Sequence, residues 1–316
     1  MRKVLITGIA GFVGSHLAER LASRFEVCGT RIDDNTANLS GIKGLNLVPC
    51  DLTERAAVEA AIERLRPDIV FHLAAQSIPS FSFNHPEETL KTNIFSTLNV
   101  FEAVLKHVPE AVVLNIGSGD EYGDAAADFL PVPEKAELKP LNPYAVSKVT
   151  QDLLAFQYWR SRGLKAVRAR PFNHFGPRQS DSFVTSEFAR QIAEIEAGIR
   201  EEKALKVGNL RTAKDFLDVR DVVAAYELLV EKGSFGEAYN VCSGRATSIR
   251  EIAETLISFS TEKIVIKEDP SRRRHTETAA IYGDAAKIKA LGWVPKYTLR
   301  ESLESILEYW RGAVLR

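Results

Sequence analysis

The chain has 316 residues, 45% hydrophobic and 26% charged, which is the balance of an ordinary globular protein. Its formal net charge of −1 argues against a nucleic-acid surface, which needs a basic excess, but leaves room for a small anionic ligand. Three widely spaced cysteines predict reduced thiols in a cytoplasmic protein without a metal site. The sequence has no run of about 18 apolar residues, so no membrane-spanning helix is expected.

The first half of the sequence alternates short apolar strands with amphipathic helices. Gly8 and Gly11 interrupt the apolar N-terminus, so we expect a strand, a turn and a helix there rather than a cleaved leader. Strands are expected at 3–7, 26–30, 46–50, 69–73, 111–116 and 165–170, with helices at 12–23, 54–65, 87–107 and 144–162. This alternation predicts an α/β fold with a Rossmann doubly wound parallel sheet.

The rhythm changes after about residue 171, where strands become sparse. Helices are expected at 183–202, 219–231, 248–258 and 299–313, with short strands at 205–207 and 238–242. We therefore predict a smaller interleaved α/β lobe that binds the substrate. The expected NAD(P)-binding Rossmann domain covers 1–170 and about 215–243, and the expected second lobe covers 171–214 and 244–316.

A glycine motif at the N-terminus predicts a dinucleotide site. Gly8, Gly11 and Gly14 lie between the first strand and the first helix, where glycines permit a tight turn, close approach to a pyrophosphate and close helix packing. The helix that follows, beginning with Phe12 and Val13, offers free N–H groups and a positive dipole to the phosphates.

The ends of the next strands indicate which dinucleotide binds. Arg31 stands nearest the end of the second strand, where an arginine binds a 2′-phosphate, so NADP(H) is favoured. Asp33 and Asp34 keep NAD(H) open, because a carboxylate there binds the ribose hydroxyls. Other expected contacts are Asp51 and Leu52 beside the adenine, and Leu73, Ala74 and Ala75 beside the ribose.

A tyrosine and a lysine form the predicted catalytic pair. Asn142 suits a helix N-cap and Pro143 the first helical position, which places Tyr144 and Lys148 one turn apart on one face. We expect the lysine to lower the tyrosine pKa, making it a general acid/base. The spacing is common on plain helices, but here the preceding strand ends near Ser118, at the edge of the sheet where ligands bind.

Together these residues resemble the extended short-chain dehydrogenase/reductases over essentially the whole chain. The matching positions are the three glycines, Asp51, Ser118 and the Tyr-x-x-x-Lys element. Within that family, three further stretches are similar to the enzymes of GDP-mannose conversion, namely 170–178, 183–185 and 207–216. The resemblance is first to GDP-4-keto-6-deoxy-D-mannose reductases and next to GDP-mannose 4,6-dehydratases.

The resemblance implies a GDP-linked sugar as the substrate and assigns residues to it. It implies sugar or diphosphate contacts from Asn173, guanine contacts from Val184 and Asn209, and a homodimer through helices 87–107 and 144–162. Lys214 stands where relatives usually have an arginine, so it keeps the charge but loses the bidentate fork. The remaining expected substrate residues are Gln76, Ser77, Arg274 for phosphate and Glu277 for the ribose.

The turn after the fifth strand bears on the choice of reaction. Dehydratases of this group carry Thr-x-Glu there, whereas this chain has Ser118, Gly119 and Asp120, whose carboxylate is one methylene shorter. We therefore predict NADPH-dependent reduction of the 4-keto group of a GDP-4-keto-6-deoxyhexose, with Tyr144 donating the proton. A 4,6-dehydratase using Asp120 and a 4-epimerase stay open, and the complete catalytic set argues against a non-catalytic NAD(P) sensor.

Overall fold

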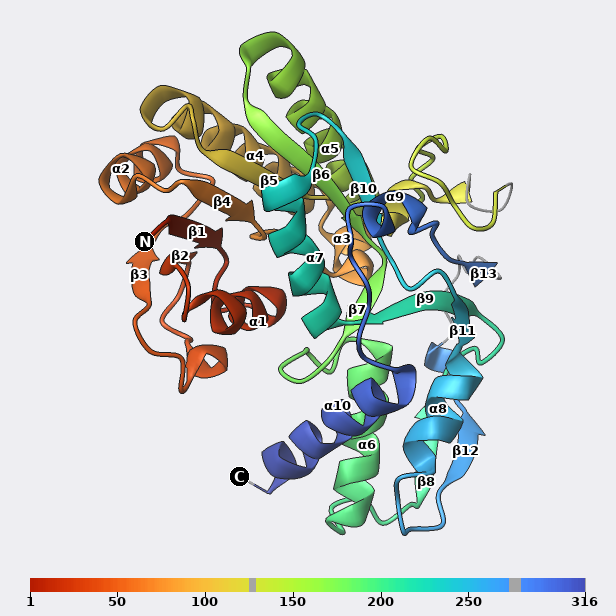
Figure 1. The fold of residues 1–316 in the computed structure, drawn as a ribbon. Helices are drawn as coiled ribbons and strands as arrows, with labels where there is room; N and C mark the ends of the chain where they lie inside the picture. The colour runs from red at the N-terminus through yellow and green to blue at the C-terminus, as the bar shows by residue number, and fades with distance from the viewer. Residues whose placement is uncertain (125–128, 273–279, 316) are drawn as a thin grey trace.

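A seven-stranded parallel sheet forms the larger part of the molecule (Figure 1). The computed structural model describes residues 1–124, 129–272 and 280–315. The strand order is β10-β6-β5-β4-β1-β2-β3, and every pair is parallel. The strands are β1 (Lys3–Thr7), β2 (Glu26–Arg31), β3 (Asn46–Pro49), β4 (Ile69–His72), β5 (Val112–Ile116), β6 (Lys165–Pro171) and β10 (Ala238–Val241).

Helices cover both faces of this sheet, as apolar strands buried on both sides require. On one face, α1 (Phe12–Leu21) and α7 (Val219–Lys232) pack against β1, β4, β5 and β6 in one hydrophobic core. On the other, α2 (Arg55–Leu65), α4 (Pro86–His107) and α5 (Pro143–Arg162) form a second core. The predicted doubly wound α/β fold is confirmed. The order reverses between β1 and β4, and ligands of such sheets bind at the carboxyl edge beside that reversal.

A smaller group of elements lies beside the carboxyl edge of the sheet (Figure 1). Its core joins α6, α8 and α10 through Phe188, Ile192, Leu256 and Ile306. The helices are α6 (Val184–Glu196), α8 (Ile249–Ile257) and α10 (Leu299–Val314). Two small sheets complete it: β8 (Ala204–Val207) with β12 (Val265–Glu268), and β7 (Asn173–Phe175), β9 (Ala213–Asp218), β11 (Ala246–Ser248) and β13 (Ala280–Ile281). The proposed domain boundaries stay a prediction.

Short elements connect these layers, and several were not expected from the sequence. They are α3 (Pro79–Asn84), α9 (Ala286–Lys289) and the 3-10 turns η1 (Ala37–Leu39), η2 (Gly119–Glu121) and η4 (Pro270–Arg272). The helix expected over 183–202 ends at Glu196, because Gly198 adopts a φ of 70° and turns the chain. No helix in the described ranges is long and apolar enough to span a bilayer.

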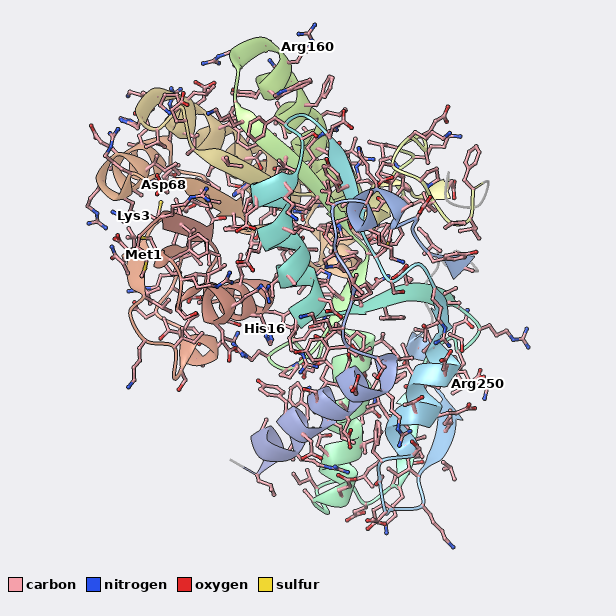
Figure 2. The ribbon with its side chains drawn as sticks, in the orientation of Figure 1. Met1, Lys3, His16, Asp68, Arg160 and Arg250 are labelled. Atoms are coloured by element: carbon pink, nitrogen blue, oxygen red, sulfur yellow. The ribbon has the colours of Figure 1, made fainter. Side chains whose placement is uncertain are left out.

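Hydrogen bonds between distant segments hold the two parts together. His16 on α1 bonds through Nε2 to the carbonyl of Pro177, which lies in the chain leading to α6. Figure 2 shows His16 on the side of α1 nearest the smaller part, whereas Lys3 and Asp68 lie at the opposite, amino edge of the sheet. Asp215, buried in β9, accepts bonds from the backbone amides of Ser243 (2.7 Å), Gly244 (2.9 Å) and Gly283 (3.3 Å).

Asp215→Ala is expected to lower the free energy of unfolding by about 2–4 kcal/mol, because three backbone amides lose their acceptor. Urea denaturation followed by circular dichroism measures the change. The exposed Glu304, replaced by Ala, is the control and is expected to shift stability by less than about 0.5 kcal/mol. A loss below about 1 kcal/mol in Asp215→Ala would show that solvent replaces the carboxylate at these amides.

Candidate active site

A cavity of about 1650 Å³ lies between the carboxyl edge of the large sheet and helices α6 and α10. Clefts that hold one drug-sized ligand measure about 300–1,000 Å³, so this cavity has room for two ligands end to end. The glycine turn lines one end, and residues of α6 and the turn at Asn209 line the other. Tyr144 and Ser118 line the middle.

The glycine turn at the start of α1 has the shape that a pyrophosphate requires. Gly8 adopts a φ of +67°, and a Cβ there would lie 3.1 Å from the backbone of Ala74. A Cβ on Gly14 would lie 2.5 Å from the carbonyl oxygen of Gly8, so α1 could not pack this closely on β1 with a side chain there. Gly11, Phe12 and Val13 line the cavity at the N-terminus of α1, where free N–H groups bind anions. These residues fit a dinucleotide.

Arg31, the residue expected to select the cofactor, lines the cavity. Its guanidinium donates to the carbonyl of Asp33 at 2.6 Å and pairs with the Asp34 carboxylate. The side chain is therefore held at the cavity wall beside Asn35 and Asn38, which the sequence reasoning missed. Asn38 donates to the carbonyl of Ala10 at 3.0 Å and so ties this segment to the glycine turn.

Asp51 and Leu52 also line the cavity, after β3. The Asp51 carboxylate accepts from the backbone amide of Thr53 at 2.9 Å and from its hydroxyl at 2.8 Å. The aspartate therefore shapes the turn before α2, whichever ligand lies beside it.

Buried polar groups fix the chain after β4, where Leu73, Ala74 and Ala75 line the cavity. The Thr7 hydroxyl accepts from the backbone amides of Leu73 and Ala74, each at 3.0 Å. Asn93 on α4 accepts from the amide of Gln76 at 2.7 Å and donates to its carbonyl at 3.0 Å. Asn93 also donates to the Ser147 hydroxyl of α5 at 2.8 Å, so one amide joins three elements. The sequence carried no signal for Asn93, because these partners lie far apart in the chain.

The predicted catalytic residues converge at the centre of the cavity. Asn142 caps α5 by accepting from the amide of Ala145 at 2.8 Å, which places Tyr144 in the first turn. Lys148, one turn later, donates from Nζ to the carbonyl of Ile116 at 2.9 Å, and its Nζ lies 5.9 Å from the centroid of the Tyr144 ring. Both side chains are buried.

Burial sets the protonation of this pair. Burial, with the negative charge of Asp120, raises the pKa of Tyr144 above its usual value, although a hydrogen bond with Ser118 acts in the opposite direction. Burial lowers the pKa of Lys148 to about 8, and the negative charge of Glu121 opposes that change. The lowering of the Tyr144 pKa that was expected from Lys148 is not seen here, because burial of the phenol and the negative charge of Asp120 act in the opposite direction. Tyr144 is a protonated phenol, which suits a proton donor.

The turn that carries Ser118 is tightly packed. The Ser118 hydroxyl accepts from the amide of Asp120 at 3.1 Å and begins the 3-10 turn η2. A Cβ on Gly119 would lie 3.0 Å from the ring of Phe172, so no larger side chain fits here unless that ring moves. Asp120 lines the cavity as the carboxylate of this turn.

At the far end of the cavity the structure brings together most of the predicted substrate residues. Gln76, Ser77, Asn173, Val184, Asn209 and Lys214 all line it, whereas Arg274 and Glu277 lie outside the described residues. Sequence reasoning missed Tyr309 and Trp310 of α10, which also line this end. Trp310 donates from its indole to the Ser186 hydroxyl at 2.8 Å, a contact across 124 positions that no local pattern indicates.

Comparison with known proteins identifies the family. The family model described as GDP-mannose 4,6 dehydratase matches residues 5–306. The chain belongs to this family. A GDP-6-deoxy-D-mannose reductase of Pseudomonas aeruginosa is 37% identical, covering 99% of this chain and 98% of that protein. A GDP-mannose 4,6-dehydratase of Yersinia enterocolitica is 28% identical over 95% of this chain and 91% of its own.

Solved structures of the same fold include relatives with different activities. The structure of RMD from Pseudomonas aeruginosa complexed with NADPH has a TM-score of 0.86 at 36% identity, covering 99% of this chain and all of that one. UDP-glucose 4-epimerase of Thermus thermophilus complexed with NAD has a TM-score of 0.88 at 28% identity, with 99% and 100% covered. Because this backbone matches both structures about equally well, the fold alone does not distinguish their reactions.

Proposed function

We propose that this protein reduces the 4-keto group of a GDP-4-keto-6-deoxyhexose with NADPH. The observation that carries the proposal is the cavity wall that brings Ser118, Tyr144 and Lys148 together, beside a turn whose Gly119 packs against Phe172. The reductase relative that is 37% identical over the whole chain supports the same reaction. The described residues contain no cluster of His, Cys, Asp or Glu that could hold a metal ion.

The residues of the site would each perform one step of a ketone reduction. The glycine turn would hold NADPH, which would supply the hydride for the ketone carbon. The Tyr144 hydroxyl donates its proton to the ketone oxygen, and Ser118 donates a hydrogen bond to that same oxygen. Lys148 would hold the cofactor ribose, and the small side chains at 73–75 would let that ribose lie close to the sheet. The ketone thereby becomes an alcohol.

The 4,6-dehydratase alternative is less well supported by this site. Dehydration also needs an acid and a base near C5 and C6 of the sugar, in addition to Tyr144. Gly119 has no side chain, and the Phe172 ring leaves little space for one. Asp120 stands where dehydratases have a glutamate, and its side chain is one methylene shorter than that glutamate. A displacement of about 1 Å at a reacting group can lower the rate by two orders of magnitude, so Asp120 is a poor replacement.

The substrate would lie along the second half of the cavity. We assign the guanine to the end formed by Val184 and Asn209 and the diphosphate to Asn173 and Lys214, all of which line the cavity. Trp310 and Tyr309 add aromatic surface at the same end, where a planar base can stack. Retention of a GDP-sugar, but not a UDP-sugar, in equilibrium dialysis would test this assignment.

The first prediction concerns the reaction itself. The protein is expected to consume NADPH when given GDP-4-keto-6-deoxymannose and to form no keto sugar from GDP-mannose and NADP⁺. Tyr144→Phe should lower kcat by about 10²- to 10⁴-fold through loss of the proton donor, with little change in dinucleotide binding. NADPH absorbance and chromatography of the sugars measure both. Formation of the keto sugar from GDP-mannose and NADP⁺, with no NADPH consumed when GDP-4-keto-6-deoxymannose is supplied, would favour the dehydratase.

The second prediction concerns pH. Lys148 is charged below its pKa of about 8 and neutral above it, while Tyr144, whose pKa is raised, stays protonated. His72, buried behind Lys148, has a pKa lowered to about 3 and stays neutral. The kcat/KM for reduction should therefore be level below pH 8 and fall about tenfold per unit above it. In Lys148→Arg this alkaline fall in kcat/KM should vanish. If the fall keeps the same midpoint pH in that variant, another group causes it.

The third prediction concerns the cofactor. Arg31→Ala should raise the Kd for NADPH by about 10- to 100-fold, because a charged hydrogen bond to the 2′-phosphate is lost, and leave that for NADH nearly unchanged. Fluorescence titration measures both constants. Arg250→Ala, which removes an exposed arginine on α8 (Figure 2), is the control. Equal losses for both dinucleotides would show that Arg31 does not select the phosphate.

The fourth prediction concerns assembly, for which we propose a homodimer through α4 and α5. Phe95 and Leu153 are 52% and 53% exposed on these helices, and Val146 and Phe156 extend the apolar surface of α5. Leu153→Asp should convert the dimer to a monomer in sedimentation velocity, because it places a charge in the apolar interface. Val294→Asp, at an exposed valine elsewhere, should stay dimeric. A monomeric wild type would contradict the proposal.

We also propose that the protein works in the cytoplasm. Its three cysteines are free and buried, and burial raises their pKa, so they are unreactive thiols suited to a reducing compartment. Cell fractionation with an antibody against the chain would test this; recovery from an oxidising compartment would contradict it.

A further inference from the structure

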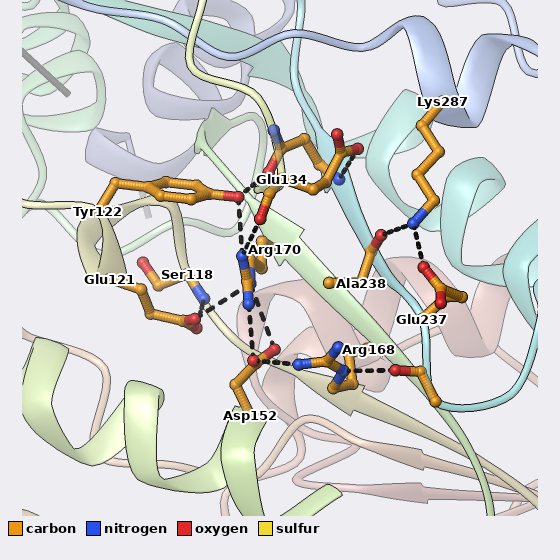
Figure 3. Close-up of polar contacts among 12 residues, drawn as sticks. Ser118, Glu121, Tyr122, Glu134, Asp152, Arg168, Arg170, Glu237, Ala238 and Lys287 are labelled. Carbon is orange, nitrogen blue, oxygen red and sulfur yellow. Dashed lines mark hydrogen bonds and ion pairs between the residues drawn. The ribbon is translucent and has the colours of Figure 1, made fainter. Parts of the chain in front are cut away.

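A buried carboxylate lies directly behind the catalytic serine. Glu121 is the last residue of η2 and is fully buried. Its Oε1 accepts from the backbone amide of Ser118 at 2.7 Å (Figure 3). The Ser118 hydroxyl in turn accepts from the amide of Asp120. The carboxylate thus fixes the backbone of the residue whose hydroxyl faces the substrate.

The surrounding chain makes room for this carboxylate. A Cβ on Gly117 would lie 2.2 Å from Glu121 Oε1, so the carboxylate occupies the space that any side chain at 117 would need. The second oxygen, Oε2, lies 3.3 Å from Nε of Arg170 and has no hydrogen-bond partner within the described structure.

Arg170 connects the turn to the helix that carries the other catalytic groups. Its Nη2 donates to Asp152 Oδ2 at 2.7 Å, and Asp152 lies one turn beyond Lys148 on α5. The same guanidinium donates from Nη1 to the Tyr122 hydroxyl and the Glu134 carbonyl, each at 3.0 Å. Arg168 donates to Asp152 at 2.6 Å from the other side, as Figure 3 shows. Ser118 and Lys148 are therefore attached to one buried network.

Packing alone does not account for this network. Burial and the negative charge of Asp152 raise the pKa of Glu121, and the positive charge of Arg170 offsets only part of that rise. Keeping a negative charge at this buried position therefore costs folding free energy. Apolar residues of similar volume often replace buried ion pairs without loss of stability. The carboxylate lies beside the catalytic groups, because it binds the amide of Ser118 and Lys148 donates to the carbonyl of Ile116, two residues before Ser118.

We propose that Glu121, held by Arg170 and Asp152, is a positioning residue that fixes the Ser118 hydroxyl relative to Tyr144. The inference rests on the proposed function, because Ser118 and Tyr144 must reach the same ketone oxygen. The hydrogen bond from the Ser118 amide is the part that positions; the ion pair with Arg170 orients the carboxylate that accepts it.

The test compares two replacements of Glu121 of similar size. Glu121→Gln keeps an oxygen acceptor for the Ser118 amide, whereas Glu121→Leu does not. We expect Glu121→Leu to lower kcat by about 100-fold, with KM and the Kd for NADPH nearly unchanged. Glu121→Gln should keep most of the wild-type kcat. Glu227→Gln, a buried carboxylate paired with Arg20 and Arg24 away from the cavity, is the matched control and should keep its kcat.

A double-mutant cycle separates positioning from general destabilisation. If Glu121 acts through Ser118, adding Glu121→Leu to Ser118→Ala should lower kcat little further than Ser118→Ala does alone. The inference would be overturned if the losses of kcat from the two single variants multiplied in the double variant. It would also be overturned if Glu121→Gln and Glu121→Leu lost kcat equally, or if Glu121→Leu kept the wild-type kcat.

A second variant covers the case in which Glu121→Leu fails to bind NADPH and is therefore unfolded. Arg170→Lys keeps the charge but loses the fork to Asp152, and it should lower kcat about tenfold at constant KM. An unchanged kcat in a folded Arg170→Lys would overturn the inference. Absence of ketone reduction by the wild type would instead overturn the proposed function, so the two failures are distinguishable.

Discussion

The space around residues 117–121 is the constraint on which the site depends. A side chain on Gly117 would collide with the Glu121 carboxylate, and one on Gly119 would press on the Phe172 ring. Ser118 therefore presents the first hydroxyl after β5 from a backbone that is packed on both sides. The packing at positions 117 and 119 therefore leaves this backbone little freedom to move.

The charged groups of the site follow from burial more than from pairing. Tyr144 and Lys148 are both buried, and each is shifted toward its neutral form. A neutral phenol has a proton to give, and a lysine with a lowered pKa still carries its charge at neutral pH. His72, bonded to Thr7 and Thr97, adds no charge behind them. The centre of the cavity is thus prepared for donating a proton, the requirement of a reduction.

The sequence predicted the large sheet well, because its strands are short apolar runs separated by helices with a clear period. It also predicted that the glycine turn, Ser118, Tyr144 and Lys148 lie at the carboxyl edge of the sheet, because parallel strands all end at that edge. It did not predict the role of Asn93, whose partner Ser147 is 54 positions away, or the Glu121–Arg170–Asp152 network, in which Arg170 and Asp152 are 18 positions apart. These residues meet only in the folded chain. The pKa of Tyr144 was misjudged for a related reason, because spacing along a helix does not reveal burial or where an ammonium points.

The path of the chain between the two parts of the molecule has an evolutionary consequence. After β6 the chain enters the smaller part, returns to add α7 and β10 to the large sheet, and leaves again before α9 packs back against β10. The smaller part is therefore built from separate stretches of the chain, and recombination could not exchange it at a single junction. Substitutions in the cavity wall offer a simpler route to new specificity than exchange of that part, and solved structures with different activities share this backbone.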